Sequence, residues 1–321
     1  MKNVYWIVIY TIILGSCSSN KHSVFEKNSN NISIDRTKGY KYINPLLDCG
    51  IQFKEITPFV SKIRNYVNTK IENGDAKIIS VYFRHLNNGY WFGINENTKF
   101  NPASMMKVPI MMEFLKIAEQ EPNVVYKQLE FKKKFGDCNY FGTDSLILGN
   151  KYPAIELLER MIKYSDNYAA GVIYDFNRLY TNDSVFFNEV MINNNINGRN
   201  PYDSVIIKDY AGFFRILYNA SFLNKQMSEF ALDLLTSTTF KYTIVRGIND
   251  STINVAHKFG ERFTDNDYQL HDCGIVYYPN EPYILCVMTR GSLDEPKKMD
   301  TIIVDISRMV YQEVDKQFKK K

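Results

Sequence analysis

Ser104 and Lys107 stand three positions apart where a strongly apolar segment predicts a helix over residues 105–118. On a helix this spacing puts both side chains on one face. A serine hydroxyl becomes nucleophilic when a neighbouring base takes its proton, and a lysine can be that base when burial or nearby positive charge lowers its pKa. Ser18 and Lys21 repeat the spacing, so the pair alone fits a helix-capping serine even better.

Ser165, Asp166 and Asn167 form a second polar group, between helices predicted over residues 154–164 and 168–176. A serine in such a loop can pass a proton to a leaving nitrogen, and an asparagine amide can hold a substrate amide. The aspartate can pin the loop by accepting backbone N–H groups. The alternative is a plain connection between helices with a capping asparagine.

Lys258, Phe259 and Gly260 form a third group, on a strand predicted over residues 254–259. The lysine offers a fixed positive charge, and the glycine lets a ligand approach the backbone. Residues 134–136 repeat the triplet, but only the later copy lies in a strand-rich segment that follows the other two groups. We therefore assign the later copy to the candidate site.

The elements around these groups predict an α+β fold. Hairpin-linked strands indicate an antiparallel sheet of about five strands flanked by N- and C-terminal helices, and the central helices form an all-helical lobe. The crevice between sheet and lobe is the expected site. The other predicted elements are helices at 53–71, 210–218, 229–235 and 299–314 and strands at 78–83, 90–94, 274–278 and 283–289.

The order Ser-x-x-Lys, Ser-Asp-Asn, Lys-x-Gly is far more specific than any of its parts. On this pattern, residues 53–315 resemble the penicillin-recognising serine enzymes, specifically the class A β-lactamase type, which implies a β-lactamase/transpeptidase-like fold. Four further segments carry the resemblance: residues 100–103, 209–211, 244–248 and 271–276.

The resemblance implies catalytic roles. Ser104 would attack a lactam or acyl-amide carbonyl, with Lys107 as the base or as part of the proton relay. Ser165 would pass a proton to the leaving nitrogen. The backbone N–H groups of Ser104 and Glu261 would form the oxyanion hole.

The resemblance also implies a binding surface. Asn167 would hold the amide side chain of the substrate, while Lys258 would attract its carboxylate and lower the pKa of Lys107. Gly260 would let the substrate lie close to the strand. The implied substrate is a β-lactam or an acyl-D-amino-acid peptide, and no cofactor is expected.

The chain lacks one family motif. In class A enzymes a Glu-x-x-Leu-Asn motif supplies the glutamate that activates water to free the acyl-enzyme, and residues 168–210 contain no such motif. Residues 193–203 occupy roughly its place. Glu189 and Asp203 are nearby carboxylates without the right neighbours. Deacylation would then be slow, and the enzyme would stall or transfer its acyl group to another acceptor.

Phe259 is a second departure, because the family usually has threonine or serine there. That hydroxyl helps to hold the β-lactam carboxylate, and phenylalanine cannot donate the bond. If the ring points into the crevice, it narrows the pocket and favours an apolar or aromatic group.

Three functions stay open on these residues. The chain is a β-lactam-acylating enzyme of class A type, a penicillin-binding, D,D-peptidase-like enzyme acting on peptidoglycan peptides, or a non-catalytic binding lipoprotein on the same scaffold. The complete set of polar residues argues against the last function. The missing glutamate argues against fast hydrolysis.

The N-terminus predicts export. Lys2 precedes an apolar run over residues 4–14 that is too short to span a bilayer. The Leu-Gly-Ser-Cys sequence ending at Cys17 resembles a bacterial lipobox, which implies a signal peptide over residues 1–16 and diacylglycerol on the cysteine sulfur. The alternative is an ordinary signal peptide with an incidental cysteine. We expect an extracytoplasmic protein, lipid-anchored to a bacterial membrane in the periplasm or at the cell surface.

The rest of the chain divides into a flexible tether, rich in Asn, Ser and Lys, over residues 17–45 and one serine hydrolase domain over residues 46–321. With 45% hydrophobic residues, the chain can build a packed core. The net charge of +4 is small, and the one basic run, at residues 316–321, reads as a solvated tail without a nucleic-acid footprint. We expect a monomer.

Four cysteines besides the lipobox residue allow three disulfide connectivities. Cys273 and Cys286 flank a turn predicted over residues 279–282, which puts them on neighbouring strands. Their positions are offset from direct opposition, so the sequence does not decide whether they form a disulfide. The other two are Cys49 and Cys138. With four histidines and no Cys-x-x-Cys pair, a metal site is not expected.

Overall fold

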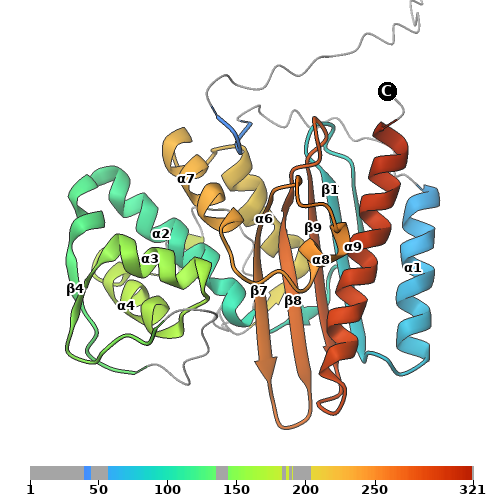
Figure 1. Cartoon of the computed structure of the whole chain (residues 1–321), viewed down its shortest axis with the longest axis horizontal. Coiled ribbons are helices and arrows are strands. Elements are labelled where there is room, and N and C mark those ends of the chain that lie inside the picture. The colour runs from blue at the N-terminus through green and yellow to red at the C-terminus, as the bar shows by residue number, and fades with distance from the viewer. Residues whose placement is uncertain are drawn as a thin grey trace, which may run out of the picture. The chain divides into compact units, whose positions relative to one another are not determined.

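Five strands form one antiparallel sheet, which confirms the predicted α+β fold. The structure, a computed structural model, describes residues 40–44, 57–134, 144–182, 186–187, 190 and 204–319. The strands are β1 (Ile78–His85), β2 (Trp91–Ile94), β7 (Val255–Phe263), β8 (Tyr268–Val276) and β9 (Tyr283–Gly291). Their order is β2-β1-β9-β8-β7, so β7, the strand of Lys258, lies at an edge (Figure 1).

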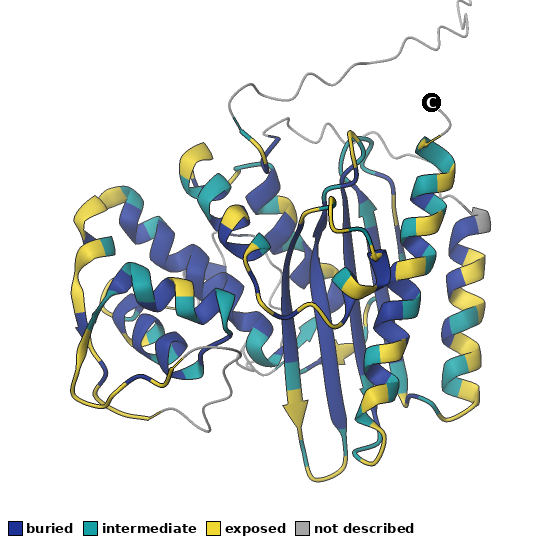
Figure 2. Ribbon diagram, in the orientation of Figure 1, coloured by how far each residue is buried: buried dark blue, intermediate teal, exposed yellow. Residues whose placement is uncertain are grey.

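Three of the described helices, one from each end of the domain and a short one before β7, cover one face of the sheet. They are α1 (Thr57–Glu72), the short α8 (Ile244–Ile248) and α9 (Pro296–Phe318) (Figure 1). Buried residues of α1 recur every three or four positions from Phe59 to Val67, so the helix turns one apolar stripe to the sheet and leaves the other side exposed (Figure 2). The two flanking helices are therefore as the sequence predicts.

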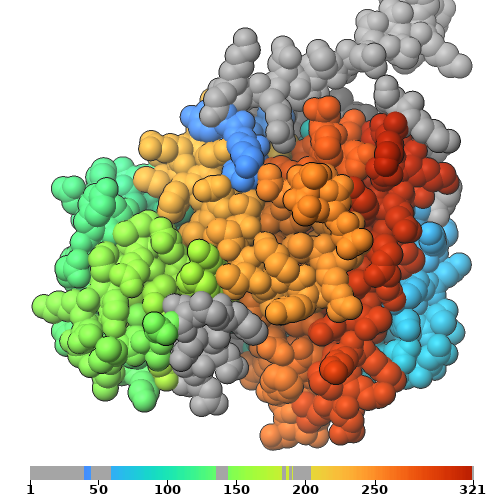
Figure 3. Space-filling view, in the orientation of Figure 1, coloured from blue at the N-terminus to red at the C-terminus, as the bar shows by residue number. Residues whose placement is uncertain are grey.

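The other face packs against the helical lobe. Its helices are α2 (Lys107–Gln120), α3 (Ala154–Lys163), α4 (Asn167–Asn177), α6 (Ile207–Tyr218) and α7 (Lys225–Thr236). Helix α2 is buried on almost all sides, as expected for a helix in the centre of a core. In the space-filling view, α7 and the segment after it lie between the green helices of the lobe and the red helix α9 (Figure 3).

Two short ladders and two 3-10 turns complete the described elements. The ladders pair β3 (Lys99–Phe100) with β6 (Val205–Ile206) and β4 (Gln128–Glu130) with β5 (Lys151–Pro153). The turns are η1 (Ala103–Met106) and η2 (Pro122–Tyr126). Because η1 follows β3 closely and α6 follows β6 directly, the β3–β6 ladder ties the start of α6 to the turn that carries Ser104.

Residues 40–44, inside the predicted tether, belong to the folded domain. Tyr42 and Ile43 are buried in the core of the helical lobe. The carboxylate of Glu229 on α7 accepts their backbone N–H groups at 2.8 and 2.9 Å. The tether prediction is wrong for these five residues, because apolar side chains and a carboxylate partner hold them in place.

Cys273 and Cys286 lie directly opposite each other on β8 and β9 and form a disulfide. The predicted offset is wrong, because the hairpin pairs Val276 with Tyr283 and its loop is longer than the turn expected at residues 279–282.

Several predictions fall outside the described residues. These are the signal peptide, the lipid on Cys17, most of the tether, Cys49 and Cys138. Within the part of the chain that the structure describes, no helix has the length and apolar character needed to cross a membrane.

Candidate active site

Ser104 lies in η1, a strained turn directly before α2. Ala103 has a φ of +49°, a left-handed value that is costly for a residue with a Cβ. Its backbone N–H donates to Asn101 Oδ1 at 3.0 Å, which stabilises this conformation. Strain of this kind persists only where the surroundings enforce it, and it clusters at functional sites.

Two side chains from other elements bind the same turn. The Tyr210 hydroxyl on α6 donates to the Met105 carbonyl at 2.8 Å. His271 Nε2 on β8 lies 3.0 Å from the Asn101 carbonyl, and its Nδ1 accepts the Thr289 N–H at 3.3 Å. The ring proton is therefore on Nε2, which donates to Asn101. Burial lowers the pKa of His271 to about 4, so the ring is neutral.

Lys107 joins three of the predicted site residues. Its Nζ lies 3.0 Å from Ser104 Oγ and 3.0 Å from Ser165 Oγ. The amine donates to the Ser165 carbonyl and to Asn167 Oδ1, each at 2.6 Å. The side chain is 4% exposed. A serine before α2 and the polar loop before α4 thus meet around one buried amine.

Asp166 holds the loop that carries Ser165. Its Oδ1 accepts the backbone N–H groups of Tyr168 and Ala169 at 2.9 and 3.1 Å, which caps α4. Its other oxygen accepts from Arg160 Nε at 3.1 Å. Ser165 is buried and has a φ of +56°, so this loop is also strained. The predicted role of Asp166 in pinning the loop is confirmed.

Lys258 approaches Ser165 from the sheet. Its Nζ donates to Ser165 Oγ and to the Phe259 carbonyl, both at 3.0 Å, and the side chain is fully buried. Burial lowers the pKa of Lys258 well below its ordinary value, and the charge of Lys107 lowers it further. The Ser165 hydroxyl therefore lies between two amines whose positive charges would repel each other.

Gly260 lets β7 pack against η1, the turn that carries Ser104. A Cβ on Gly260 would collide with the Pro102 carbonyl oxygen and would lie 2.8 Å from Met105 Cγ. The sequence predicts that a ligand lies close to this glycine, whereas in the structure the turn that carries Ser104 lies there. The contact places Gly260, the residue before Glu261, against the turn that carries Ser104, and the predicted oxyanion hole would use the backbone N–H groups of Ser104 and Glu261.

Phe259 does not point into the crevice. Its ring is 3% exposed and stacks on Phe240 with 3.8 Å between the ring centroids, within the core on the α8 and α9 side of the sheet. Lys258 Nζ lies 4.0 Å from the centroid of the same ring, which is a cation–π contact. An aromatic face therefore contacts the lysine where the family pattern has a hydroxyl.

A buried polar group behind β7 received no role from the sequence. Asp272 on β8 lies 2.9 Å from His257 Nδ1 and accepts from Thr243 Oγ1 at 2.5 Å. Burial favours the neutral carboxyl, but His257 and Thr243 hold the pKa of Asp272 below its ordinary value. Its negative charge partly offsets the lowering of the pKa of Lys258. The one indication in the sequence that Asp272 has a role was its place in the segment 271–276, which carries part of the family resemblance.

The described residues place seven predicted site residues in one region. They are Ser104, Lys107, Ser165, Asn167, Lys258, Gly260 and Glu261. The candidate water activators, Glu189 and Asp203, lie outside the described residues, as does the segment 193–203. The base for deacylation therefore stays a prediction.

Known proteins share this architecture. The model of the β-lactamase enzyme family matches residues 58–314. No curated protein matches the sequence. The solved structure of PBP-A is 23% identical with a TM-score of 0.71, and the match covers 82% of this chain and 98% of that one. An engineered variant of PBP-A, solved as an acyl-enzyme complex with penicillin G, is 21% identical with a TM-score of 0.68 and the same two coverages.

Two β-lactamase structures are also similar. The TLA-3 extended-spectrum β-lactamase is 18% identical with a TM-score of 0.68, and the match covers 79% of this chain and 98% of that one. A β-lactamase from Chitinophaga pinensis is 18% identical with a TM-score of 0.66, covering 79% and 99%. At these identities the likeness establishes the fold.

Proposed function

The chain belongs to the β-lactamase enzyme family of penicillin-recognising serine enzymes, and on that premise we propose that β-lactams acylate Ser104 and that the acyl-enzyme is hydrolysed slowly. One observation carries the proposal. Lys107 Nζ lies 3.0 Å from each of two serine oxygens, Ser104 Oγ and Ser165 Oγ.

The partners of Lys107 can be satisfied by a neutral amine. Its two contacts at 2.6 Å are to the Ser165 carbonyl and Asn167 Oδ1, which are acceptors only. A neutral amine satisfies both with its two N–H groups and keeps its lone pair for a hydroxyl proton. Because Lys258 Nζ shares Ser165 Oγ, a second charge beside it is disfavoured. This supports Lys107 as the base that activates Ser104.

Acylation follows from these positions. Lys107 takes the proton of Ser104, whose oxygen attacks the lactam carbonyl, and the backbone N–H groups of Ser104 and Glu261 bind the developing oxyanion. Ser165 gives its proton to the lactam nitrogen as the C–N bond breaks. Lys107 or Lys258, each 3.0 Å from Ser165 Oγ, returns a proton to it.

Slow release rests on the sequence. Residues 168–210 lack the Glu-x-x-Leu-Asn motif that positions a water-activating glutamate in class A enzymes. Without a fixed base, water attacks the ester slowly. The acyl group then persists on Ser104 or passes to another acceptor.

Intact-mass spectrometry after exposure to penicillin G, followed over time, tests both parts. We expect an adduct of one penicillin per chain that persists after free penicillin is removed. Ser104→Ala should form no adduct, and Ser292→Ala, outside the site, should behave as wild type. Absence of both an adduct and hydrolysis with penicillins and cephalosporins would contradict acylation, and hydrolysis with rapid loss of the adduct would contradict slow release alone.

A D,D-peptidase-like activity on peptidoglycan peptides is the second candidate. The absence of the Glu-x-x-Leu-Asn motif from residues 168–210 favours it, because penicillin-binding enzymes are acylated by β-lactams and then stall. Release of D-alanine from an acyl-D-alanyl-D-alanine peptide by wild type, but not by Ser104→Ala, would support this activity.

We propose further that Cys17 carries a lipid that holds the protein outside the cytoplasm on a bacterial membrane. The apolar run over residues 4–14 and the Leu-Gly-Ser-Cys sequence support this. In a bacterial host, Cys17→Ser should move the protein from the membrane fraction to the soluble fraction.

A further inference from the structure

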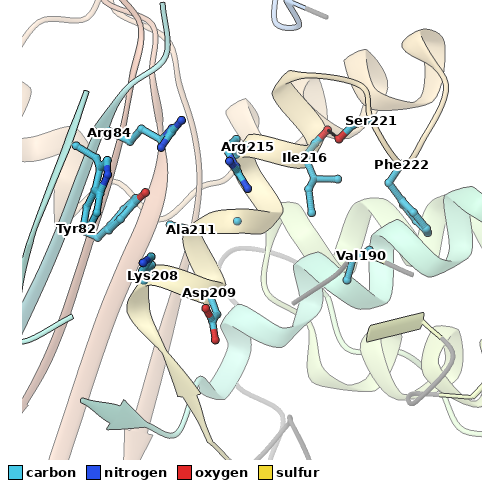
Figure 4. A pocket seen from close by; sticks show the side chains of 12 residues that line it. Tyr82, Arg84, Val190, Lys208, Asp209, Ala211, Arg215, Ile216, Ser221 and Phe222 are labelled. Carbon is cyan, nitrogen blue, oxygen red and sulfur yellow. Dashed lines mark hydrogen bonds between the residues drawn. The ribbon is translucent and has the colours of Figure 1, made fainter. Parts of the chain in front are cut away.

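A cavity lies between the β1–β2 hairpin and α6 (Figure 4). Its volume of about 440 Å³ is within the range of small-molecule sites. Tyr82 and Arg84 on β1 and Trp91 on β2 line the sheet side. The cavity shares none of its described lining residues with the candidate active site. It is therefore a separate candidate for binding.

Helix α6 forms the opposite wall. Lys208 and Arg215 are seven positions apart, two helical turns, so both project from the same face. Ala211 and Gly212 lie between them, and their small size keeps the space open. Figure 4 shows Arg84 extending from the sheet toward α6, where Arg215 lies. Cationic side chains from both the sheet and α6 therefore line the same cavity.

The described lining carries more positive than negative charge. Arg84, Lys208 and Arg215 contribute three cations, and Asp209 contributes one carboxylate. Burial raises the pKa of Asp209 above its ordinary value, although Lys208 opposes the shift, so burial disfavours the negative form. An anionic ligand is therefore favoured over a neutral or cationic one.

Aromatic rings provide an apolar surface beside these charges. Trp91 and Tyr82 stack with 5.8 Å between the ring centroids and 26° between the ring planes. Lys208 Nζ lies 4.9 Å from the centroid of the Trp91 ring, within cation–π range. Trp91 is 39% exposed, so part of its indole is available for a flat or ring-shaped group.

We propose that this cavity binds a small anionic sugar, whose carboxylate or phosphate contacts Arg84, Lys208 and Arg215. Guanidinium groups bind both kinds of anion through paired hydrogen bonds. The sugar ring lies against the Trp91 indole, and its hydroxyls find polar partners in Asp209 and Ser221. A purely aromatic acid would leave these last two groups unused. The inference does not depend on the function of Ser104.

Trp91 makes the test direct. The chain has only one other tryptophan, Trp6, so the fluorescence of the full chain carrying Trp6→Phe reports on Trp91 alone. We would titrate it with N-acetylmuramic acid, N-acetylglucosamine 6-phosphate and neutral N-acetylglucosamine. We expect a saturable change with one or both anionic sugars and none with the neutral sugar. The comparison of the two anionic sugars distinguishes carboxylate from phosphate, and calorimetry repeats each titration.

Variants link the signal to the cavity. Lys208→Met and Arg215→Gln should each weaken binding about tenfold, the effect of losing one charged hydrogen bond. Lys62→Met, on the exposed side of α1, is the matched control and should bind as wild type. The proposal is overturned if neither anionic sugar gives fluorescence change or heat, if the neutral sugar binds equally well, or if the cavity variants bind as wild type.

Discussion

The Ser165 hydroxyl receives one lysine amine from the helical lobe and one from the sheet, both at 3.0 Å. A serine placed between two such groups can be reprotonated as soon as it gives up its own proton. Its position explains why the strained φ of +56° is retained, since a relaxed backbone would move the hydroxyl away from Lys107 or Lys258.

Removing this hydroxyl should slow acylation without blocking it. We expect Ser165→Ala to lower the rate of acylation of Ser104 by about 100-fold, the contribution typical of one positioned proton donor. Time-resolved mass spectrometry with penicillin G measures the rate. Ser165→Gly also lacks the hydroxyl but tolerates the left-handed φ, so equal losses in both variants trace the effect to the hydroxyl. A wild-type rate in both variants would refute the role.

Phe259 allows an isosteric test of the missing hydroxyl. Phe259→Thr and Phe259→Val should each lower the free energy of unfolding by about 3 kcal/mol, because both remove the stacking on Phe240. Only the threonine variant adds a hydroxyl, but residue 259 faces the core on the α8 and α9 side of the sheet, away from the crevice. We therefore expect Phe259→Thr and Phe259→Val to be acylated by penicillin G at equal rates. Faster acylation of Phe259→Thr would mean that a hydroxyl at this position reaches the substrate.

At the scale of elements, β7 and η1 act as one unit through Gly260. We expect Gly260→Ala to lower the rate of acylation at least about tenfold, because the collision with Pro102 displaces the backbone of Glu261 from the oxyanion. The free energy of unfolding of the same variant, measured in urea, shows how much of the lower acylation rate comes from lost stability.

Gly274→Ala is the matched control for that prediction. A Cβ on Gly274 would collide with the Ala256 carbonyl oxygen, so it disturbs β7 from β8, away from η1. We expect Gly274→Ala to be destabilised but to keep more of its acylation rate per folded molecule. If the two variants lose acylation equally, the contact of Gly260 with the turn has no special role.

The elements show where prediction from sequence ends. Apolar periodicity predicted the sheet, both flanking helices and the helices that carry the site, because burial of apolar residues leaves that pattern. The start of β8 was missed: the strand begins at Tyr268, not at residue 274. Gln269, His271 and Asp272 are polar yet buried there, and only tertiary partners make their burial favourable.

The seven residues that the structure brings together were each singled out from their order in the chain, while their environments were not. Whether Phe259 faces the crevice or the core depends on Phe240, a residue 19 positions earlier in the connection between α7 and α8. The partner of Gly260 is likewise a turn more than 150 residues away in the chain. Neither contact can be predicted from the residues that neighbour Phe259 and Gly260 in the sequence. The opposed positions of Cys273 and Cys286 were missed for a related reason, since the register depends on the loop length.

On the scale of the whole molecule, the site lies where the helical lobe meets the edge strand β7 of the sheet. His271 on β8 joins the sheet to the segment before Ser104 through the Asn101 carbonyl. Its Nδ1 already accepts the N–H of Thr289, so a second ring proton would break that bond. This buried neutral ring links the stability of the fold to pH.

The sign of the effect follows from the pKa of His271, about 4 in the folded protein against an ordinary 6.5. The unfolded chain binds the proton at higher pH, so the contribution of the neutral ring is complete above pH 6.5. This contribution to the free energy of unfolding decreases as the pH drops from 6.5 to 4, and below pH 4 it is lost. The total loss is about 3 kcal/mol. Burial raises the pKa values of Asp209 and Asp300, which offsets part of this loss near the acid end.

His271→Gln separates this contribution from the others. Glutamine can still donate an N–H to the Asn101 carbonyl but does not titrate, so the variant keeps the contact and loses the pH dependence. Between pH 7 and pH 4 we expect the free energy of unfolding in urea to fall by about 3 kcal/mol more for wild type than for His271→Gln. NMR titration of the His271 ring checks the cause directly, and the ring should still be neutral at pH 5. Parallel stability curves for the two proteins, or a His271 ring that titrates near 6.5, would refute the assignment.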